Sequence, residues 1–192
     1  VLDSNGYMKL TDFGIAKVDK KENYKETSGT LGYMAPEVMC GQNHTIAVDY
    51  FALGVIGYEL MNGCRPYHGK NRREIKEKMM AKQVQVKKDQ IPNGWSVESA
   101  DFINRLLQRK PINRLGLRGC IEVKEHLWFK DFDWKGLYLY KLKAPFIPKQ
   151  GDNFDHRYCN APDKSGVNTL ERYRNIMNAP KYKEIFVDFN YL

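Results

Sequence analysis

The residues with the clearest chemical potential are a carboxylate beside a turn and two charged residues far apart in the chain. Asp12 stands in Asp12-Phe13-Gly14, directly after a segment predicted to be a strand. Glu37 ends a glycine-containing run that starts at Gly29, and Arg114 follows a proline in a basic segment. An Asp at such a junction is either a surface turn residue or a group placed for catalysis.

The elements that position these residues are mostly helices. Residues 1–11 form a predicted β-hairpin, because Asn5-Gly6 is a strong turn signal between two short apolar segments. Residues 12–36 lack periodicity and form a long loop, and loops of this length in compact domains are usually functional. Residues 47–61 are apolar almost all round, which predicts a buried central helix that Asn62-Gly63 ends.

Three further helices are predicted before the character of the chain changes. Residues 71–82 form an amphipathic surface helix, Ser96 caps a helix that stops before Pro111, and a short helix covers residues 121–129. From residue 143, prolines and glycines among polar residues predict an extended segment with a short helix at residues 168–178. The aromatic end of the chain is predicted to dock on another surface.

The composition is that of an ordinary protein with enough apolar residues for a core. Of 192 residues, 42% are hydrophobic and 28% charged, and no apolar run is long enough to span a bilayer. The four cysteines are scattered without metal-ligand spacing, so we expect reduced thiols. The net charge of +8 is spread over many segments, which favours solvated faces, or a surface that attracts acidic partners, over a nucleic-acid surface. We expect a cytoplasmic or nuclear location.

Four motifs in a fixed order give the chain a family resemblance. Asp12-Phe13-Gly14 is followed by Gly29-Thr30-Leu31-Gly32-Tyr33-Met34-Ala35-Pro36-Glu37, and D-F-G followed by A-P-E delimits the activation segment of protein kinases. Val48-Asp49-Tyr50-Phe51-Ala52-Leu53-Gly54-Val55 resembles the V-D-x-W-x-L-G-V helix of that family. Arg109 to Gly116 resembles its late arginine motif. Together these motifs make the sequence similar to a protein kinase over essentially its whole length.

This resemblance implies a role for each singled-out residue. Asp12 is expected to hold Mg²⁺ against the phosphates of ATP, Phe13 to pack beneath the site, and Gly14 to let the backbone switch. Glu37 and Arg114 are expected to form a structural ion pair that fixes the end of the activation segment. Asp49 is expected to accept backbone N–H bonds from the catalytic loop, although a carboxylate in the first turn of a helix also fits plain capping.

The same segment indicates the substrate class. Gly29-Thr30 matches the loop that receives the residue after the phosphoacceptor, in the form typical of Ser/Thr kinases rather than tyrosine kinases. Leu31 and Gly32 replace the Pro-Glu common in the family, which leaves the substrate preference open. The implied partners are protein substrates with Ser or Thr acceptors, together with an upstream kinase or a regulatory subunit.

The regulatory position of the segment has several interpretations. Counting back from Gly29, the usual phosphosite falls on Glu26, with Thr27 and Ser28 beside it. Either Glu26 acts as a permanent anion, or Thr27 is phosphorylated in a shifted register, or none of the three regulates anything.

The tail indicates the kinase group. Lys143-Ala144-Pro145-Phe146-Ile147-Pro148 followed by Asn153-Phe154-Asp155 resembles the tail of AGC kinases, the group of cyclic-AMP-dependent kinase, in which Phe154 would approach ATP. The final aromatic residues resemble the hydrophobic motif that docks on the upper lobe, with Asn190 at the phosphoacceptor position. The residues carrying this motif are Phe186, Phe189 and Tyr191. We therefore expect a kinase domain part at residues 1–129 and an AGC tail at residues 130–192.

The expected fold is mainly α: a kinase-like C-lobe with a short β-hairpin at its start, followed by an extended tail. The sequence contains no Gly-rich phosphate loop, no V-A-I-K lysine and no H-R-D-x-x-x-x-N, so the N-lobe and the catalytic loop are lacking. We expect this 192-residue chain to be inactive by itself and poorly stable, with Phe51 and Leu53 partly uncovered. The alternative is a truncated kinase or pseudokinase that binds proteins without catalysis.

Overall fold

The computed structural model describes residues 1–18, 20, 22–149 and 151, and these residues are mainly helical. The chain divides into two compact units, which are described separately. Of the described residues, the main unit contains Val1 and those in the range 9–143, and the smaller unit contains residues 2–8, 144–149 and 151. The boundary expected between residues 129 and 130, where the kinase domain part ends and the tail begins, stays a prediction.

The predicted hairpin is present in minimal form. A single antiparallel bridge joins Leu2 and Met8, and Asp3 N–H donates to the Tyr7 carbonyl oxygen at 2.9 Å. Gly6 has a φ of +84°, a left-handed conformation that glycine adopts without strain. Val1 and Lys9 also exchange backbone hydrogen bonds, of 3.0 and 2.8 Å, but no continuous strand forms among the described residues and no third segment extends the ladder. The predicted pair of strands is therefore corrected to a turn with one bridge.

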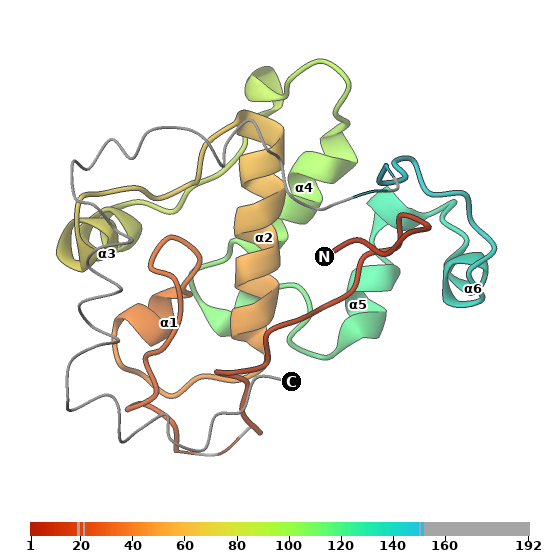
Figure 1. Ribbon diagram of the computed structural model, residues 1–192. Helices are drawn as coiled ribbons and strands as arrows, with labels where there is room; N and C mark the ends of the chain where they lie inside the picture. The colour runs from red at the N-terminus through yellow and green to blue at the C-terminus, as the bar shows by residue number, and fades with distance from the viewer. Residues whose placement is uncertain (19, 21, 150, 152–192) are drawn as a thin grey trace, which may run out of the picture. The chain divides into compact units, whose positions relative to one another are not determined.

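Helix α2 is the longest element and runs through the middle of the main unit (Figure 1). It spans Ala47–Asn62, and Gly63 ends it in the left-handed conformation predicted for this position, with φ +72°. The prediction that α2 is buried on every side is wrong in part. Leu53, Ile56 and Leu60 are 42%, 45% and 70% exposed and, at spacings of three and four residues, form one apolar stripe on the described surface. Leu53 was expected to lose part of its cover, which its exposure confirms, whereas Phe51, expected to lose cover with it, is fully buried.

Helix α4, Val97–Leu106, packs closely against α2. Ser96 caps it as predicted, since the Ser96 hydroxyl oxygen accepts a hydrogen bond from Ser99 N–H at 3.2 Å. The two helices approach each other closely at Gly54, where a Cβ atom would lie 2.8 Å from the Leu106 Cβ. The packing of α2 against α4 therefore requires a glycine at this position.

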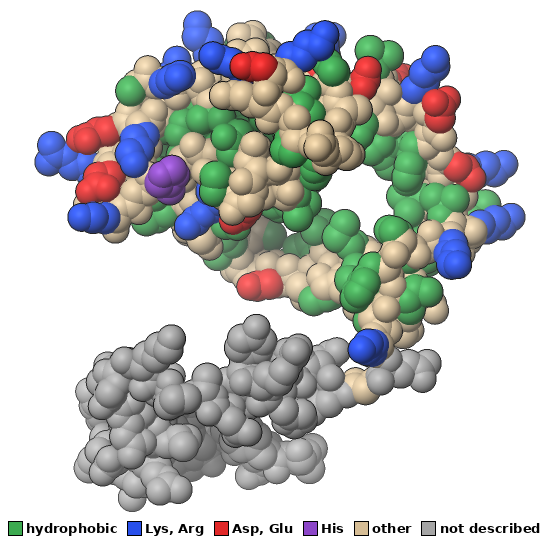
Figure 2. All heavy atoms as spheres, turned by 90° about the horizontal axis from the view of Figure 1, so that it is seen from above, with side chains coloured by type: hydrophobic (Ala, Val, Ile, Leu, Met, Phe, Trp, Pro, Cys, Tyr) green, Lys and Arg blue, Asp and Glu red, His purple; other side chains and the backbone are tan. Residues whose placement is uncertain are grey.

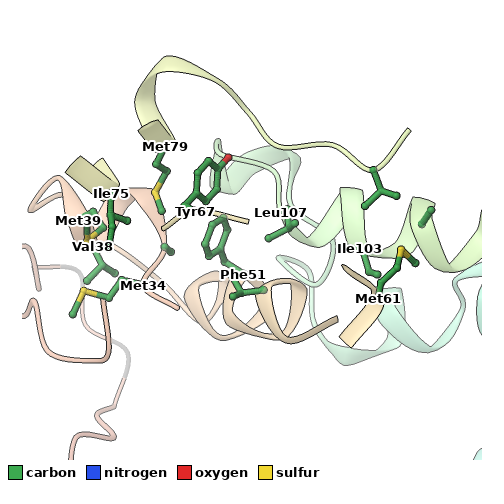
Figure 3. Packing of buried hydrophobic residues seen from close by; sticks show 14 residues of the cluster. Met34, Val38, Met39, Phe51, Met61, Tyr67, Ile75, Met79, Ile103 and Leu107 are labelled. Atoms are coloured by element: carbon green, nitrogen blue, oxygen red, sulfur yellow. The ribbon is translucent and has the colours of Figure 1, made fainter. Parts of the chain in front are cut away.

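Helices α1, Pro36–Met39, and α3, Arg72–Ala81, pack against each other beside α2. Helix α3 confirms the surface helix predicted at residues 71–82. Figure 3 shows the buried side chains between these elements, with Val38 and Met39 of α1 near Ile75 of α3. The buried side chains of the main core therefore hold α1 against the other helices of the main unit.

A second, aromatic core lies around α4 and the elements that follow it. Cys120–Lys124 forms α5, Leu127–Phe129 forms the 3₁₀ turn η3, and Trp134–Tyr138 forms α6. The single helix predicted at residues 121–129 is therefore two elements, because the His126 Nδ1 atom accepts from Trp128 N–H at 3.2 Å and starts a new turn. The remaining turns are η1 at Lys88–Gln90 and η2 at Pro111–Asn113.

The described surface carries dispersed charge. On the face shown in Figure 2, Lys and Arg side chains are spread around the outline together with Asp and Glu side chains, and hydrophobic side chains reach the surface between them. Among the described residues, no helix is both long and apolar enough to cross a membrane.

Candidate active site

Asp12 occupies a turn whose backbone conformation is uncommon for a residue with a side chain. Its φ is +60°, a left-handed conformation in which Asp is tolerated better than most residues. Its Oδ1 atom accepts a long hydrogen bond, 3.4 Å, from Gly14 N–H, and the side chain is exposed. The turn therefore presents a carboxylate to the outside with most of its lone pairs available to a ligand.

Phe13 differs from the expectation. It is 68% exposed, so within the described residues it does not pack beneath the site. Residues 9–18 are all exposed, so Phe13 shares the exposure of the whole segment around this turn.

The loop after Asp12 is fixed to the start of α2 by a polar network that sequence reasoning missed. Asn23 is 7% exposed, and its Nδ2 atom donates to the carbonyl oxygen of His44 at 2.6 Å. In return, His44 N–H donates to Asn23 Oδ1 at 2.8 Å, while Asn43 Oδ1 accepts from the N–H groups of Asn23 and Tyr24 at 3.0 and 3.1 Å. No local pattern marks these residues, because each bond joins positions about twenty apart.

Glu26, the residue at the expected phosphosite, forms an ion pair. Its Oε2 atom lies 3.1 Å from Lys17 Nζ, and its carbonyl oxygen lies 3.1 Å from His44 Nε2. Glu26 and Thr27 are half-buried, and Ser28 is exposed. A carboxylate at residue 26 thus already bridges two parts of the loop, as a phosphate at this position would also be able to do.

The segment from Gly29 to Tyr33 makes a tight turn before α1. Gly29 has a φ of +130°, which favours glycine, and Thr30 is exposed while its carbonyl oxygen accepts from Tyr33 N–H at 2.9 Å. The Tyr33 hydroxyl donates to Glu59 Oε2 of α2 at 2.7 Å. This bond is the main cause that raises the pKa of Tyr33 above its ordinary value.

Glu37 and Arg114 form the ion pair expected between them. Both side chains are essentially buried, and Arg114 Nη1 and Nη2 donate to Glu37 Oε1 and Oε2 at 2.7 and 2.9 Å. The remaining guanidinium N–H groups donate to carbonyl oxygens of Gln108, Ala47 and Arg109 at 3.0, 2.8 and 3.3 Å. All five donors of Arg114 are therefore used, and α1 is joined to α2 and to the loop after α4.

Asp49 lies in the first turn of α2 and is exposed. The described residues provide no hydrogen bond to its carboxylate, so its expected role toward a catalytic loop stays a prediction. Its place at the positive end of the helix dipole is favourable by itself.

The residues near Asp12 fit a shared magnesium ion better than a closed metal cage. Within the described ranges, no group of three or more His, Cys, Asp or Glu side chains could hold a metal ion. Mg²⁺ is usually held by one or two carboxylates together with substrate phosphates and waters, and a single exposed Asp suits that arrangement. Asp12 is the residue that would contribute to such an ion.

The tail residues singled out from the sequence cannot be placed in this site. Phe154 and the hydrophobic-motif residues Phe186, Phe189 and Tyr191 lie outside the described residues. Their roles toward ATP and toward an upper lobe remain predictions.

Comparison with known proteins shows the family to which the chain belongs. The protein kinase domain family matches residues 1–129. The chain is 35% identical to ribosomal protein S6 kinase alpha-6 of Homo sapiens over 85% of the chain and 21% of that protein. It is 32% identical to serine/threonine-protein kinase N2 of Danio rerio over 100% of the chain and 20% of that protein. Against serine/threonine-protein kinase YPK2/YKR2 of Saccharomyces cerevisiae, identity is 37% over 77% of the chain and 21% of that protein.

The chain thus spans about a fifth of the length of these three relatives. The matched domain covers the D-F-G turn, the segment closed by Glu37 and Arg114, and α2. The chain belongs to the protein kinase family, and within that family to the serine/threonine kinases of the AGC type.

Proposed function

We propose that the protein containing this chain transfers the γ-phosphate of ATP to Ser and Thr hydroxyls of protein substrates. The observation that carries the proposal is the activation segment: it starts at the exposed Asp12 carboxylate and ends at Glu37, which the buried guanidinium of Arg114 holds. The serine/threonine kinases among the relatives support the substrate class.

The chain's own residues would bind and position the reactants. Asp12 would contribute a carboxylate to Mg²⁺, and that ion supplies neutralisation of phosphate charge when ATP is bound. Gly29 and Thr30 would line the surface on which the substrate backbone lies, because both are exposed at the turn before α1. The Glu37–Arg114 pair would keep this surface fixed relative to α2.

We further propose that the 192-residue polypeptide by itself transfers no phosphate. Its sequence contains no H-R-D-x-x-x-x-N motif, from which kinases of this type take the catalytic base and a second metal ligand. Phosphoryl transfer would therefore depend on residues that this sequence does not include.

For regulation, we propose that Glu26 is a permanent anion in place of a phosphorylated residue. Its ion pair with Lys17 at 3.1 Å supports this interpretation over phosphorylation of Thr27. In the natural-length protein, Glu26→Gln should lower activity, and Thr27→Ala should leave it unchanged. The opposite pattern would favour the shifted phosphosite, and no effect of either change would remove this position from regulation.

A second candidate function is protein binding without catalysis. The apolar stripe of Leu53, Ile56 and Leu60 on α2 favours it, because a solvent-facing stripe of this kind suits a protein contact. Catalytic assay decides between the two candidates. If the natural-length protein phosphorylates no Ser or Thr substrate under any activating condition, the non-catalytic function is favoured. If activity is found and is lost in Asp12→Asn, the kinase function is supported.

A further inference from the structure

Arg65 follows the end of α2 and lies against the activation segment. Its guanidinium carbon is 5.8 Å from the centre of the Tyr33 ring, a cation–π arrangement. Beside it, Gly32 is buried, and a Cβ atom there would overlap Arg65 Nη1 and lie 2.9 Å from Arg65 Cδ and Cζ. The guanidinium therefore occupies the space that a side chain at residue 32 would need. The close approach depends on glycine.

The charge of Arg65 has no anionic partner in the described part of the chain. Among the described residues, no carboxylate pairs with Arg65 and no oxygen atom accepts a hydrogen bond from it, although Arg65 is half-buried. Arg114 shows the contrast, since all five of its N–H donors find acceptors. A half-buried guanidinium with free donors is held in place by Tyr33 and retains its full capacity for an external anion.

Glu59, the nearby acid, is already engaged. Its Oε2 atom accepts the Tyr33 hydroxyl at 2.7 Å, so the same ring carries Glu59 at its hydroxyl end and Arg65 over its face. Arg65 acts on the pKa of Tyr33 in the direction opposite to Glu59, lowering it, although the hydrogen bond to Glu59 raises this pKa by more. A basic substrate residue approaching here would meet the unpaired guanidinium, whereas an acidic one would find free donors.

We propose that Arg65 is a specificity-determining residue that binds an acidic or phosphorylated side chain of a protein substrate lying along Gly29–Gly32. The inference rests on the proposed kinase function and names the substrate class for the same site. A carboxylate and a phosphate both present two oxygens that match the guanidinium fork, so the shared chemistry is an oxyanion with two acceptors. Leu31 and Gly32, which replace the Pro-Glu common in the family, leave this position without an acid of its own.

The test is steady-state phosphorylation of matched peptides by the natural-length protein. The peptides share one Ser acceptor and differ at a single neighbouring position, scanned on both sides, which carries Glu, phosphoserine, Ala or Lys. One charge-assisted hydrogen bond contributes roughly 1.5 kcal/mol, so kcat/KM for the best anionic peptide should exceed that for the Ala peptide by about tenfold. The Glu and phosphoserine arms show which of the two anions is preferred.

Substitutions assign the preference to Arg65. Arg65→Ala should bring the anionic and Ala peptides to equal kcat/KM, and remaining turnover of the Ala peptide, at whatever level, shows that the variant is folded. Arg65→Lys should keep part of the preference, because a charge remains without the fork. Gly32→Ala should reduce the preference with the charge intact, because its methyl group displaces the guanidinium. Arg73→Ala, at an exposed arginine that pairs with Glu77, is the matched control and should change nothing.

The outcomes separate the inference from the function on which it rests. A wild-type preference for Lys or Ala at every scanned position, or an anionic preference that survives Arg65→Ala, would overturn the role of Arg65 while the kinase function stands. If no peptide of any charge is phosphorylated under any activating condition, the kinase function fails and the inference fails with it.

Discussion

Replacing Glu37 with Gln should destabilise the joint between α1 and the body of the main unit. The substitution keeps the size and shape of the side chain, so it opens no cavity, but it removes one of two opposite charges that are almost completely buried. Two charge-assisted hydrogen bonds, 2.7 and 2.9 Å long, then lose their ionic character. Leaving one charge of a buried pair uncompensated costs about 3–5 kcal/mol.

The size of the effect follows from how Arg114 is enclosed. Its other three donors are bound to backbone carbonyl oxygens, so the guanidinium cannot turn toward water when Glu37 changes. The double variant Glu37→Leu/Arg114→Met should cost less than the sum of the two single variants, because no unpaired charge remains. It should still be less stable than the wild type, since those carbonyl oxygens lose their donors.

The assay is hydrogen exchange of the backbone amides of α1 and α2 in the natural-length protein, which measures local opening free energies without requiring a two-state protein. Arg73→Ala serves as the control. Its ion pair with Glu77 has a similar length, 2.8 Å, but both side chains are largely exposed. Such a pair contributes about 0.3–0.5 kcal/mol. Equal effects of Glu37→Gln and Arg73→Ala on α1 exchange would refute the reasoning from burial.

Three further changes have defined outcomes. Tyr67→Phe should lower the free energy of unfolding, measured by urea titration, by about 1–3 kcal/mol, because the Tyr67 hydroxyl accepts a hydrogen bond from Val84 N–H at 2.9 Å. The control is Tyr58→Phe, which should cost less in the same titration because the Tyr58 hydroxyl has no hydrogen bond among the described residues. Gly54→Ala should lower the free energy of unfolding by about 1–3 kcal/mol, seen as a lower melting temperature, because the added methyl group pushes α4 away from α2. An unchanged melting temperature would show that the two helices can move apart without cost. The pKa of Glu98 is lowered from 4.5, first by a hydrogen bond from its own backbone N–H and then by the Ser96 side chain. A depressed folded-state pKa stabilises the fold above the unfolded value and loses this effect as the pH falls through the folded value. Glu98→Gln should therefore lower the urea midpoint at pH 7 and match the wild type in strong acid, whereas a deficit independent of pH would contradict the assignment.

Features with a local cause could be predicted from the sequence. Ser96 and Gly63 mark helix ends because capping depends on one residue and its immediate neighbours. The pairing of Glu37 with Arg114 was expected only through family resemblance, since the two residues are far apart in the chain. The continuous helix expected around His126 failed because a side-chain cap interrupts it, and capping by histidine is a weak sequence signal.

Features that depend on contacts between distant segments could not be predicted. An apolar helix sequence does not say which of its faces other elements cover, so the exposure of Leu60 was not foreseen. The network of Asn23 and His44 and the contact of Gly32 with Arg65 join segments about twenty to thirty residues apart. Neither leaves a periodic or capping signal.

The most direct test of the central claim is phosphate transfer from ATP by the natural-length protein and by its Asp12→Asn variant, with analysis of the phosphorylated amino acid. Our account predicts phosphoserine or phosphothreonine from the wild type. It predicts a loss of about 100- to 1000-fold in the variant, the size expected when one preorganised electrostatic group is removed. Undiminished activity in Asp12→Asn, or phosphotyrosine as the product, would contradict it.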